Sequence, residues 1–394
     1  MALTRRAFLN LGGSGLAATS LLTSVNCSRT ASAPAKATTT PTWEERIADI
    51  EQRIRQSMGA RQVPGVSIAV IRDASIAWTG HFGVRDRATG VPVDDATVFS
   101  AQSMSKPVFA YRVMKLREQG LLDLDAPLTR YTRDIFVKDD VRLHEITARR
   151  VLSHTTGLPN WRTPGDPLRI NFTPGSTWSY SGEGYHYLQS IVSQLTGHVD
   201  ERNCDTFEMD VRVCASDFGE YMEANLLRPF GMASSGYALT PRMQRVLAAP
   251  HDAAGQSVAK TTPPSALAIA RYGSAGALMT TASDYARFLI EVMQPKPADD
   301  YRLSEASRQE MLKPHIDASA SPFKTSWALG WQIWQLEQGT VVAHGGDSDG
   351  WHSQSAFSPE RQSGFVILTN GEGGLPLIWT DLLTPLVDGA VFAT

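Results

Sequence analysis

The two ends of this 394-residue chain carry β-rich runs, whereas the long stretch between them does not. Near the beginning, residues 66–71 and 76–80 are rich in β-branched and aromatic residues and flank a short polar turn, a pattern typical of a hairpin. Runs of the same kind return late in the chain, at residues 329–334, 340–343, 354–357 and 364–369. We therefore expect an α+β fold in which both chain ends build one antiparallel sheet with flanking helices.

Helical patterns lie before, between and after these strands. Apolar residues at helical spacing predict a helix over residues 43–58, and Gly120 ends a second helix that begins near Ser103. Further helices are expected at residues 218–227, at 283–293 with Ser283 as N-cap, and at 377–391. Residues 121–276 are rich in proline and loops, so we expect a mostly helical insertion there, inside a domain that spans residues 43–394.

The first residues resemble an export signal rather than part of the fold. Arg5 and Arg6 precede an apolar run with small residues, which is the order found in a twin-arginine-type signal. We expect residues 1–35 to be a signal peptide, residues 36–42 to be a linker, and the mature protein to be periplasmic or secreted. A lipid anchor on Cys27 is the alternative.

Cysteine is rare in this chain. If Cys27 leaves with the signal, Cys204 and Cys214 remain as an even pair on either side of a short polar loop. In an oxidising compartment such a pair is expected to form a disulfide, and two free buried thiols are the alternative. Two cysteines alone do not make a metal site, so no metal is expected.

Composition argues against two classes of partner. The net charge is −3 and no basic run is interleaved with aromatic residues, so a nucleic acid is not expected to bind. No apolar run beyond the N-terminus reaches the ~20 residues needed to span a bilayer. The sequence does not indicate an oligomeric state.

Ser103 and Lys106 form a Ser-x-x-Lys pair at the expected start of a helix. Pro107 fixes that start, because proline is tolerated only in the first turn. Residues three apart share one face of a helix, so the lysine amine can reach the serine hydroxyl. The lysine then activates the serine as a nucleophile if burial lowers the lysine pKa. A capping serine beside a surface lysine is the alternative for this pair taken alone.

Two later motifs supply chemistry that suits an activated serine. Tyr180 and Gly182 are the ends of a Tyr-Ser-Gly motif, and a tyrosine hydroxyl near a lysine can transfer protons. His344 precedes Gly345 and Gly346 after a β-rich run, where glycines let backbone N–H groups face an oxyanion. Taken alone, the tyrosine would be a core residue and the glycines a turn at a strand end.

In this order, the three motifs resemble those of the serine β-lactamase and penicillin-binding protein superfamily, in its branch of class C β-lactamases, DD-carboxypeptidases and related esterases. Residues 152–158 and 276–282 also resemble connecting segments of that family. The resemblance extends over residues 43–382. It implies a helical domain beside a sheet with flanking helices, which agrees with the element order above, and a serine hydrolase that needs no cofactor.

The resemblance also implies roles for individual residues. Ser103 would be the acylated nucleophile, and Lys106 and Tyr180 would share the general acid and base work, with the base undecided between them. The backbone N–H groups of Ser103 and Asp347 would form the oxyanion hole. The other site residues that the motifs imply are Gly182, His344, Gly345 and Gly346.

Two positions depart from the family pattern. The second motif often ends in an asparagine that hydrogen-bonds a substrate amide, and here Gly182 stands in that place. The third motif of β-lactamases commonly begins with lysine, a permanent cation, whereas His344 is mostly neutral at pH 7. Both changes weaken recognition of β-lactams and peptide C-termini, and both suit ester substrates.

The sequence therefore favours an exported serine esterase that acts through an acyl-enzyme on a small-molecule ester, amide or peptidoglycan-derived substrate. A D-Ala-D-Ala carboxypeptidase, a D-amino-acid-specific peptidase or a weak β-lactamase is the alternative with the same chemistry. A catalytically silent envelope protein that binds peptidoglycan is the alternative from another class.

Overall fold

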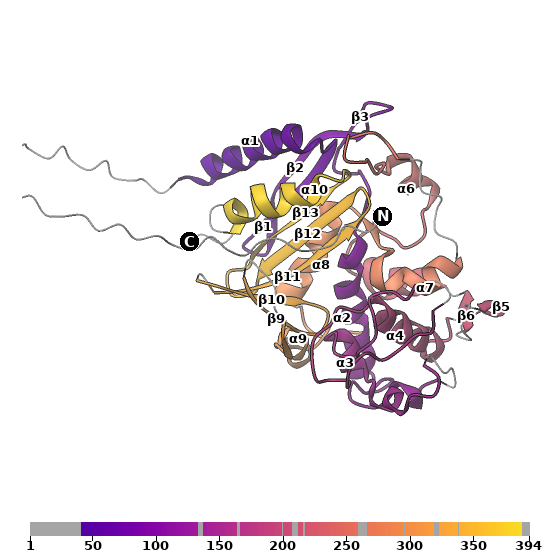
Figure 1. Ribbon diagram of the computed structural model, residues 1–394. Coiled ribbons are helices and arrows are strands. Elements are labelled where there is room, and N and C mark those ends of the chain that lie inside the picture. Colours follow the sequence, from indigo (N-terminus) through magenta and orange to yellow (C-terminus); the bar gives the residue numbers. More distant parts are fainter. Residues whose placement is uncertain are drawn as a thin grey trace, which may run out of the picture. The chain divides into compact units, whose positions relative to one another are not determined.

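Strands from both ends of the chain meet in one nine-stranded antiparallel sheet, as the computed structural model in Figure 1 shows. The strand order is β3-β2-β1-β13-β12-β11-β10-β9-β8, so β1 from the beginning of the chain pairs with β13 from its end. The expected α+β fold is confirmed. The strands are β1 (Gly65–Arg72), β2 (Ser75–Asp86), β3 (Val91–Pro92), β8 (Ile316–Ala318), β9 (Lys324–Trp327), β10 (Gln332–Leu336), β11 (Gly339–Ser348), β12 (Trp351–Ser358) and β13 (Ser363–Thr369).

The structure describes most of the chain, with short gaps. The described residues are 41–132, 137–163, 166–198, 200–206, 212–215, 217–258, 266–294, 296–318, 323–337 and 339–387. The expected signal peptide, with Cys27, lies outside these residues, as does all but the end of the expected linker. Export and the fate of Cys27 stay predictions.

Alternating residues of the central strands face two separate hydrophobic cores. On β1, Val66, Ile68 and Val70 belong to one core, whereas Ala69 and Ile71 belong to the other. Side chains of a strand point to opposite faces in turn, so β1 is buried on both sides. This explains why its sequence is a continuous apolar run instead of an alternation of apolar and polar residues.

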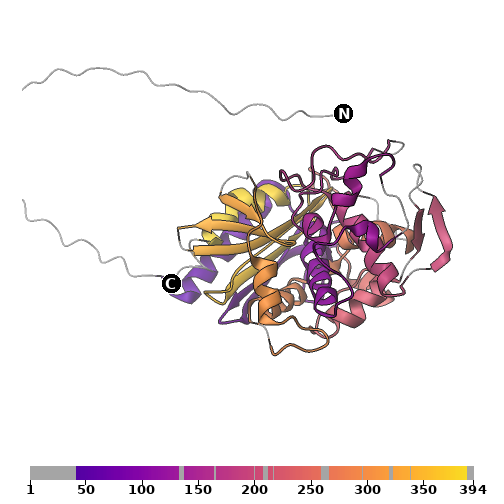
Figure 2. The same ribbon diagram turned by 90° about the horizontal axis from the view of Figure 1, so that it is seen from below.

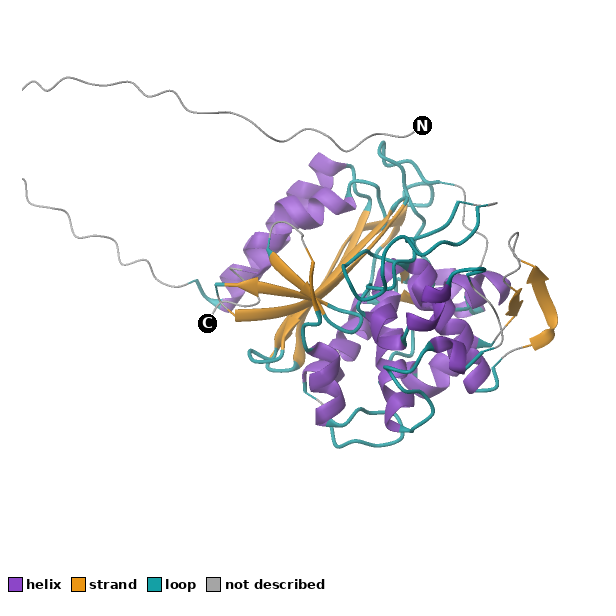
Figure 3. Cartoon of the chain, turned by 60° about the horizontal axis from the view of Figure 1, so that its bottom comes forward, coloured by secondary structure: helices purple, strands orange, loops and turns teal. Residues whose placement is uncertain are grey.

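Helices from different parts of the chain cover the two faces. The first core packs under α1 (Trp43–Arg61) and the C-terminal helix, which begins as α10 (Gly374–Pro376), continues through Leu377–Leu382 and stays helical to residue 387. The second core lies on the opposite face, where α8 (Ala282–Met293) packs on β1 and β13. Figures 1 and 3 show α1 and α10 on one side of the sheet and the remaining helices on the other.

The helical insertion packs beside the sheet, on the side of α8 (Figure 2). It packs against α2 (Ser105–Glu118), the helix that precedes it, through α7 (Ala266–Gly276), and α7 in turn contacts α4 (Gly182–Leu195). The shorter helices of this region are α3 (Ala148–Leu152), α5 (Phe218–Met222) and α6 (Pro241–Val246), and α9 (Glu305–Leu312) leads back to the sheet. No helix in the described part of the chain is long and apolar enough to cross a membrane.

Several boundaries differ from the sequence prediction. The N-cap of α8 is Thr281, whose side chain accepts a hydrogen bond from the Asp284 backbone N–H, so the prediction of Ser283 as the cap was wrong. The Ser283 hydroxyl hydrogen-bonds Asp95 instead, and this tertiary partner decides between neighbouring residues that are both good caps. A hairpin of β5 (Asp200–Thr206) and β6 (Arg212–Ala215) also lies in the region expected to hold helices and loops.

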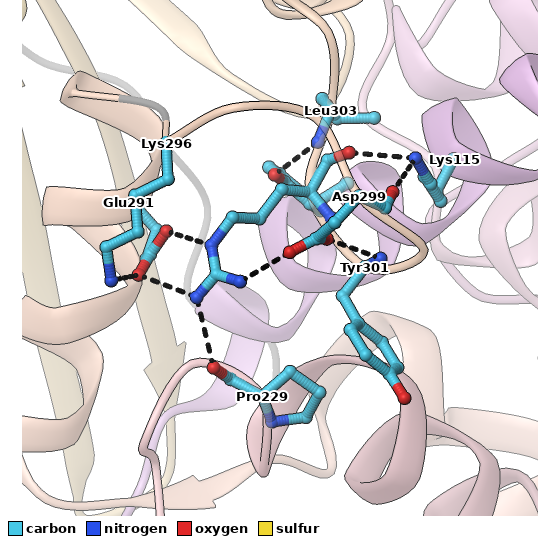
Figure 4. Close-up of polar contacts among 9 residues, drawn as sticks. Lys115, Pro229, Glu291, Lys296, Asp299, Tyr301 and Leu303 are labelled. Carbon is cyan, nitrogen blue, oxygen red and sulfur yellow. Dashed lines mark hydrogen bonds and ion pairs between the residues drawn. The ribbon is translucent and has the colours of Figure 1, made fainter.

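Arg302 connects the loop before α9 to the helices around it. Its guanidinium donates to Glu291 on α8 at 2.8 and 3.2 Å and to Asp299 in its own loop at 2.8 Å. Lys115 on α2 donates to the backbone carbonyl of Arg302 at 2.8 Å, and Figure 4 shows the partners converging on this loop. Since Glu291 is nearly buried, its carboxylate depends on these donors.

We predict that Arg302→Ala lowers the free energy of unfolding by about 2–3 kcal/mol, because a nearly buried carboxylate loses charged hydrogen-bond donors. Arg308→Ala is the matched control, since its partner Glu305 is half exposed and such a pair contributes about 0.5 kcal/mol or less. Urea denaturation measures both. Equal losses in the two variants would show that the Arg302 contacts do not stabilise the fold.

We also predict a disulfide between Cys204 and Cys214, whose backbone positions face each other across the β5–β6 pair. Closing a loop of this size stabilises a protein by about 3 kcal/mol, so reduction should lower the unfolding temperature. Mass spectrometry of a non-reduced digest of the exported protein tests the pairing. Recovery of both cysteines as free thiols would show the prediction to be wrong.

Candidate active site

Ser103 lies in a tight turn that leads directly into α2. Residues Gln102–Met104 form a 3-10 turn and α2 begins at Ser105, so the helix starts slightly later than expected and Pro107 still falls in its first turn. Gln102 has a φ of 49°, in the left-handed region that a residue with a side chain seldom occupies. Such backbone strain persists only where surrounding contacts hold it, and it gathers at functional sites.

Contacts from distant elements hold this turn. The Ser105 hydroxyl donates to the Gln102 carbonyl at 2.7 Å and accepts from the Leu278 N–H at 3.0 Å. The Ala101 N–H donates back to the Leu278 carbonyl at 2.9 Å, and the Ser353 hydroxyl on β12 donates to the Ala101 carbonyl at 3.1 Å. Ser103 itself stays half-buried, so its hydroxyl is fixed in place and open to a ligand.

Lys106 is buried directly beside Ser103. Its Nζ lies 3.2 Å from the Ser103 Oγ and donates to the Ala275 carbonyl at 2.7 Å, in the last turn of α7. Burial lowers the pKa of Lys106 to about 7, because an ammonium loses its hydration there. A large fraction of the lysine is therefore the neutral amine near neutral pH, and the neutral amine can accept a proton.

Tyr180 reaches the same place from the start of α4. Ser181 is the N-cap of that helix, and its hydroxyl accepts from the Gly184 N–H at 2.9 Å. The Tyr180 hydroxyl hydrogen-bonds Ser103, and the Lys106 Nζ lies 4.8 Å from the centre of the tyrosine ring. Burial raises the pKa of Tyr180 well above its ordinary value, so the phenol keeps its proton.

His154 holds Tyr180 in place, a contact that no sequence pattern indicated. The imidazole lies against the Tyr180 ring with centroids 4.2 Å apart and an interplanar angle of 32°. Its Nδ1 accepts a hydrogen bond from the Ser181 N–H at 3.0 Å. Because Nδ1 is an acceptor, the proton of the neutral ring is on Nε2. His154 is fully buried, and burial holds its pKa well below the ordinary histidine value.

His344 lies on β11, next to Tyr180 and Trp327. Its ring centroid is 6.4 Å from that of Tyr180 and 5.7 Å from that of Trp327. The Nδ1 lies 2.7 Å from the Gly345 carbonyl, which can only accept, so Nδ1 carries the proton and Nε2 is an unprotonated acceptor. Burial, with a smaller contribution from Lys106, lowers the pKa of His344 to about 3. The residue is therefore neutral at pH 7, as the sequence predicted.

Gly346 lets β11 pass close to the turn that carries Ser103. A Cβ at Gly346 would lie 2.3 Å from the Ala101 carbonyl oxygen, and one at Gly345 would lie 2.8 Å from the Gln354 side-chain oxygen. A side chain at position 346 would therefore clash with the backbone, whereas one at position 345 would require the end of the Gln354 side chain to shift. Asp347 follows at the end of the strand, where the Nδ1 of buried His352 lies 2.7 Å from its carboxylate, outside hydrogen-bond geometry.

Gly182 is also closely packed, against Trp161, a residue that no sequence motif singled out. A Cβ at Gly182 would lie 2.4 Å from the Trp161 indole and 2.7 Å from the Asn160 carbonyl oxygen. An asparagine at position 182 would therefore require the Asn160–Trp161 segment to move. The indole occupies the space into which a side chain at this position would extend.

The structure thus brings Ser103, Lys106, Tyr180 and His344 together and places Gly182, Gly345 and Gly346 around them. Cys204 and Cys214 lie apart from this group in the sequence and belong to the β5–β6 hairpin. Among the described residues, no group of three or more histidine, cysteine, aspartate or glutamate side chains could hold a metal ion.

Known proteins share this sequence and this fold. A family model described as beta-lactamase matches residues 50–378. A human protein named for its likeness to beta-lactamases is 25% identical to this chain. The match covers 84% of this chain and 66% of the human protein's length. Penicillin-binding protein 4 of Amycolatopsis lactamdurans is 24% identical over 88% of both chains.

A solved structure has the same fold. D-alanine carboxypeptidase AmpC from Burkholderia cenocepacia superposes with a TM-score of 0.68 at 19% identity, over 87% of this chain and 100% of that one. The family model covers most of the nine-stranded sheet, the helical insertion and all the residues gathered around Ser103. The chain therefore belongs to the beta-lactamase family.

Proposed function

We propose that this protein is a serine esterase that hydrolyses small neutral esters through an acyl-enzyme on Ser103. The observation that carries the proposal is a nucleophile–base pair beside a neutral histidine. Ser103 is next to a lysine whose pKa is lowered to about 7, and the neighbouring His344 is neutral. Membership of the beta-lactamase family supports the serine hydrolase chemistry.

In the acylation half, neutral Lys106 accepts the Ser103 proton as Oγ attacks the ester carbonyl carbon. The carbonyl oxygen becomes an oxyanion, which the backbone N–H groups of Ser103 and Asp347 stabilise. The bond to the alcohol oxygen then breaks, and the Tyr180 hydroxyl donates its proton to that oxygen. The Lys106 ammonium returns its proton to Tyr180. The raised pKa of Tyr180 supports this division, with Lys106 as the base and Tyr180 as the proton donor.

In the second half, water replaces the alcohol. A water oxygen attacks the acyl carbon while Tyr180 and Lys106 take up its proton. The bond to Ser103 Oγ breaks, and the serine regains its proton from the same pair. The free acid leaves and the enzyme returns to its starting state, without any metal or organic cofactor in the reaction.

A D-Ala-D-Ala carboxypeptidase is the second candidate, and its support is the shared fold with a D-alanine carboxypeptidase. The substrate of such an enzyme carries a carboxylate. Here His344 is neutral, with an unprotonated Nε2 that has no hydrogen-bond partner among the residues that the structure describes. Since a lone pair repels a carboxylate, this site favours a substrate without that charge.

We predict that Ser103→Ala abolishes both ester turnover and labelling by a fluorophosphonate probe, because it removes the hydroxyl that lies within hydrogen-bond distance of the Lys106 Nζ. Intact-protein mass spectrometry should find one probe per wild-type molecule and none on the variant. Ser176→Ala, at an exposed serine, is the control and should label normally. A wild-type protein that neither labels nor turns over esters would support the silent peptidoglycan-binding alternative.

Lys106 and Tyr180 should act as one unit. Lys106→Ala or Tyr180→Phe alone should lower kcat/KM by about 10²-fold or more, because each removes one side of the proton transfer. The double variant should be little worse than the poorer single variant, since residues that share one task give non-additive losses. Lys296→Ala, at an exposed lysine, is the control. Losses that multiply would contradict a shared role.

Substrate charge provides a matched test of the neutral site. p-Nitrophenyl valerate and mono-p-nitrophenyl glutarate have the same leaving group and acyl chain length and differ in one terminal carboxylate. We expect kcat/KM to favour the valerate by about tenfold or more, and to be lower still for nitrocefin and D-Ala-D-Ala peptides. A tenfold preference for the glutarate, nitrocefin or the peptide would favour the peptidase or β-lactamase function instead.

A further inference from the structure

Two large aromatic side chains stay exposed next to the residues around Ser103. Trp161 is 39% exposed and Tyr272 is 37% exposed. Their rings meet edge to face, with centroids 5.1 Å apart and an interplanar angle of 73°. Single exposed apolar residues are common on protein surfaces, but a contacting aromatic pair beside a reactive serine is a specific arrangement.

Trp161 belongs to the site because of where its ring lies. The indole packs on Gly182, two residues after Tyr180 and at the first position of α4. It occupies the space of the side chain that Gly182 lacks. The group that faces a ligand at this position is therefore an aromatic ring instead of an amide.

Trp161 is also held rigidly. The next residue, Arg162, forms two hydrogen bonds with the Glu183 carboxylate, at 2.9 and 2.7 Å, and both side chains are buried. The carbonyl of Asn160 accepts from the N–H groups of Gly182 and Glu183, each at 2.9 Å. Both neighbours of Trp161 are thus fixed to the start of α4, so binding a ligand on the indole costs little ordering.

Tyr272 reaches the same area from α7. It lies one helical turn before Ala275, whose carbonyl accepts the hydrogen bond from Lys106. The Arg271 guanidinium lies 4.8 Å from the centre of the Tyr272 ring. This cation–π contact helps to hold the ring in place. The two aromatic residues therefore join the Tyr180 side of the site to the Lys106 side.

We propose that Trp161 and Tyr272 form an aromatic platform that binds an apolar, planar group of the ester substrate. The proposal rests on the proposed esterase function and extends it to a substrate class, namely esters with an aromatic acyl or alcohol group. Aromatic contacts of this kind change binding by about two- to tenfold per ring. Stacking on the platform replaces the amide hydrogen bond for which Gly182 has no side chain.

Two substrate series test the platform and identify the part of the ester that it binds. The acyl series compares p-nitrophenyl phenylacetate with p-nitrophenyl acetate, and the alcohol series compares benzyl acetate with ethyl acetate. In the wild-type protein, kcat/KM should favour the aromatic member of one series. Trp161→Ala should reduce that aromatic-to-aliphatic ratio by about tenfold, mainly through KM, and Tyr272→Ala should reduce it by a smaller factor.

Tyr301→Ala is the matched control, because Tyr301 is equally exposed and belongs to the Arg302 loop. Its ratios should equal those of the wild-type protein. A fall confined to the acyl series assigns the platform to the acyl group, and a fall confined to the alcohol series assigns it to the alcohol. Unchanged ratios in both Trp161→Ala and Tyr272→Ala, or an equal fall in Tyr301→Ala, would overturn the proposal.

A binding measurement separates this proposal from the esterase function. Equilibrium dialysis of p-nitrophenyl phenylacetate against Ser103→Ala, with and without Trp161→Ala, measures affinity without turnover. We expect the second substitution to weaken binding by about five- to tenfold. Unchanged affinity would contradict the platform, whereas a wild-type protein that binds this ester and hydrolyses none would contradict only the esterase function.

Discussion

The burial of Lys106 is the constraint on which the rest of the site depends. A lysine amine is a useful base near neutral pH only if its charged form is destabilised, and here burial alone accounts for the lowered pKa. The fold provides that burial by enclosing α2 between the sheet and α7. The Ala275 carbonyl at the end of α7 then gives Nζ one hydrogen bond and leaves it within 3.2 Å of Ser103.

Burial also keeps the two histidines near Ser103 uncharged. His154 and His344 both have pKa values well below that of an ordinary histidine, so two residues that could have carried charge are neutral. Each uses Nδ1 for a hydrogen bond to a neighbouring backbone group, and within the described part of the chain each keeps an Nε2 without a partner. A neutral ester is compatible with such surroundings, whereas a carboxylate would gain no cationic partner from these two residues.

Sequence patterns sufficed for six strands of the sheet, for the helix after Ser103 and for the grouping of Ser103, Lys106 and Tyr180, whereas the short strands β3, β8 and β9 were not predicted. Strand composition and the position of Pro107 are local properties, and the three motifs keep a fixed order along the chain. The β5–β6 hairpin was missed because its sequence is polar and lacks the alternation of a half-buried strand. The cap of α8 was missed because Thr281 and Ser283 are both suitable, and the contact of Ser283 with Asp95 is a tertiary one.

The contacts of His154 and Trp161 could not be read from the sequence for a similar reason. Each touches a residue far along the chain, Tyr180 in one case and Gly182 in the other. A histidine or a tryptophan before a proline-rich loop carries no signal for such a partner. Gly182 was recognised as a departure from the family pattern, but only the structure explains it, because the indole fills the space above the glycine.

The most direct test of a neutral Lys106 as the base is the pH dependence of fluorophosphonate labelling at Ser103. The labelling rate constant reports attack by the serine without a later hydrolysis step. Measured from about pH 5 to about pH 9, it should rise as Lys106 loses its proton, with an apparent pKa of about 7. A rate that is independent of pH over this range, or one that still rises without a plateau at about pH 9 as expected for an ordinary lysine pKa of about 10.4, would contradict the account.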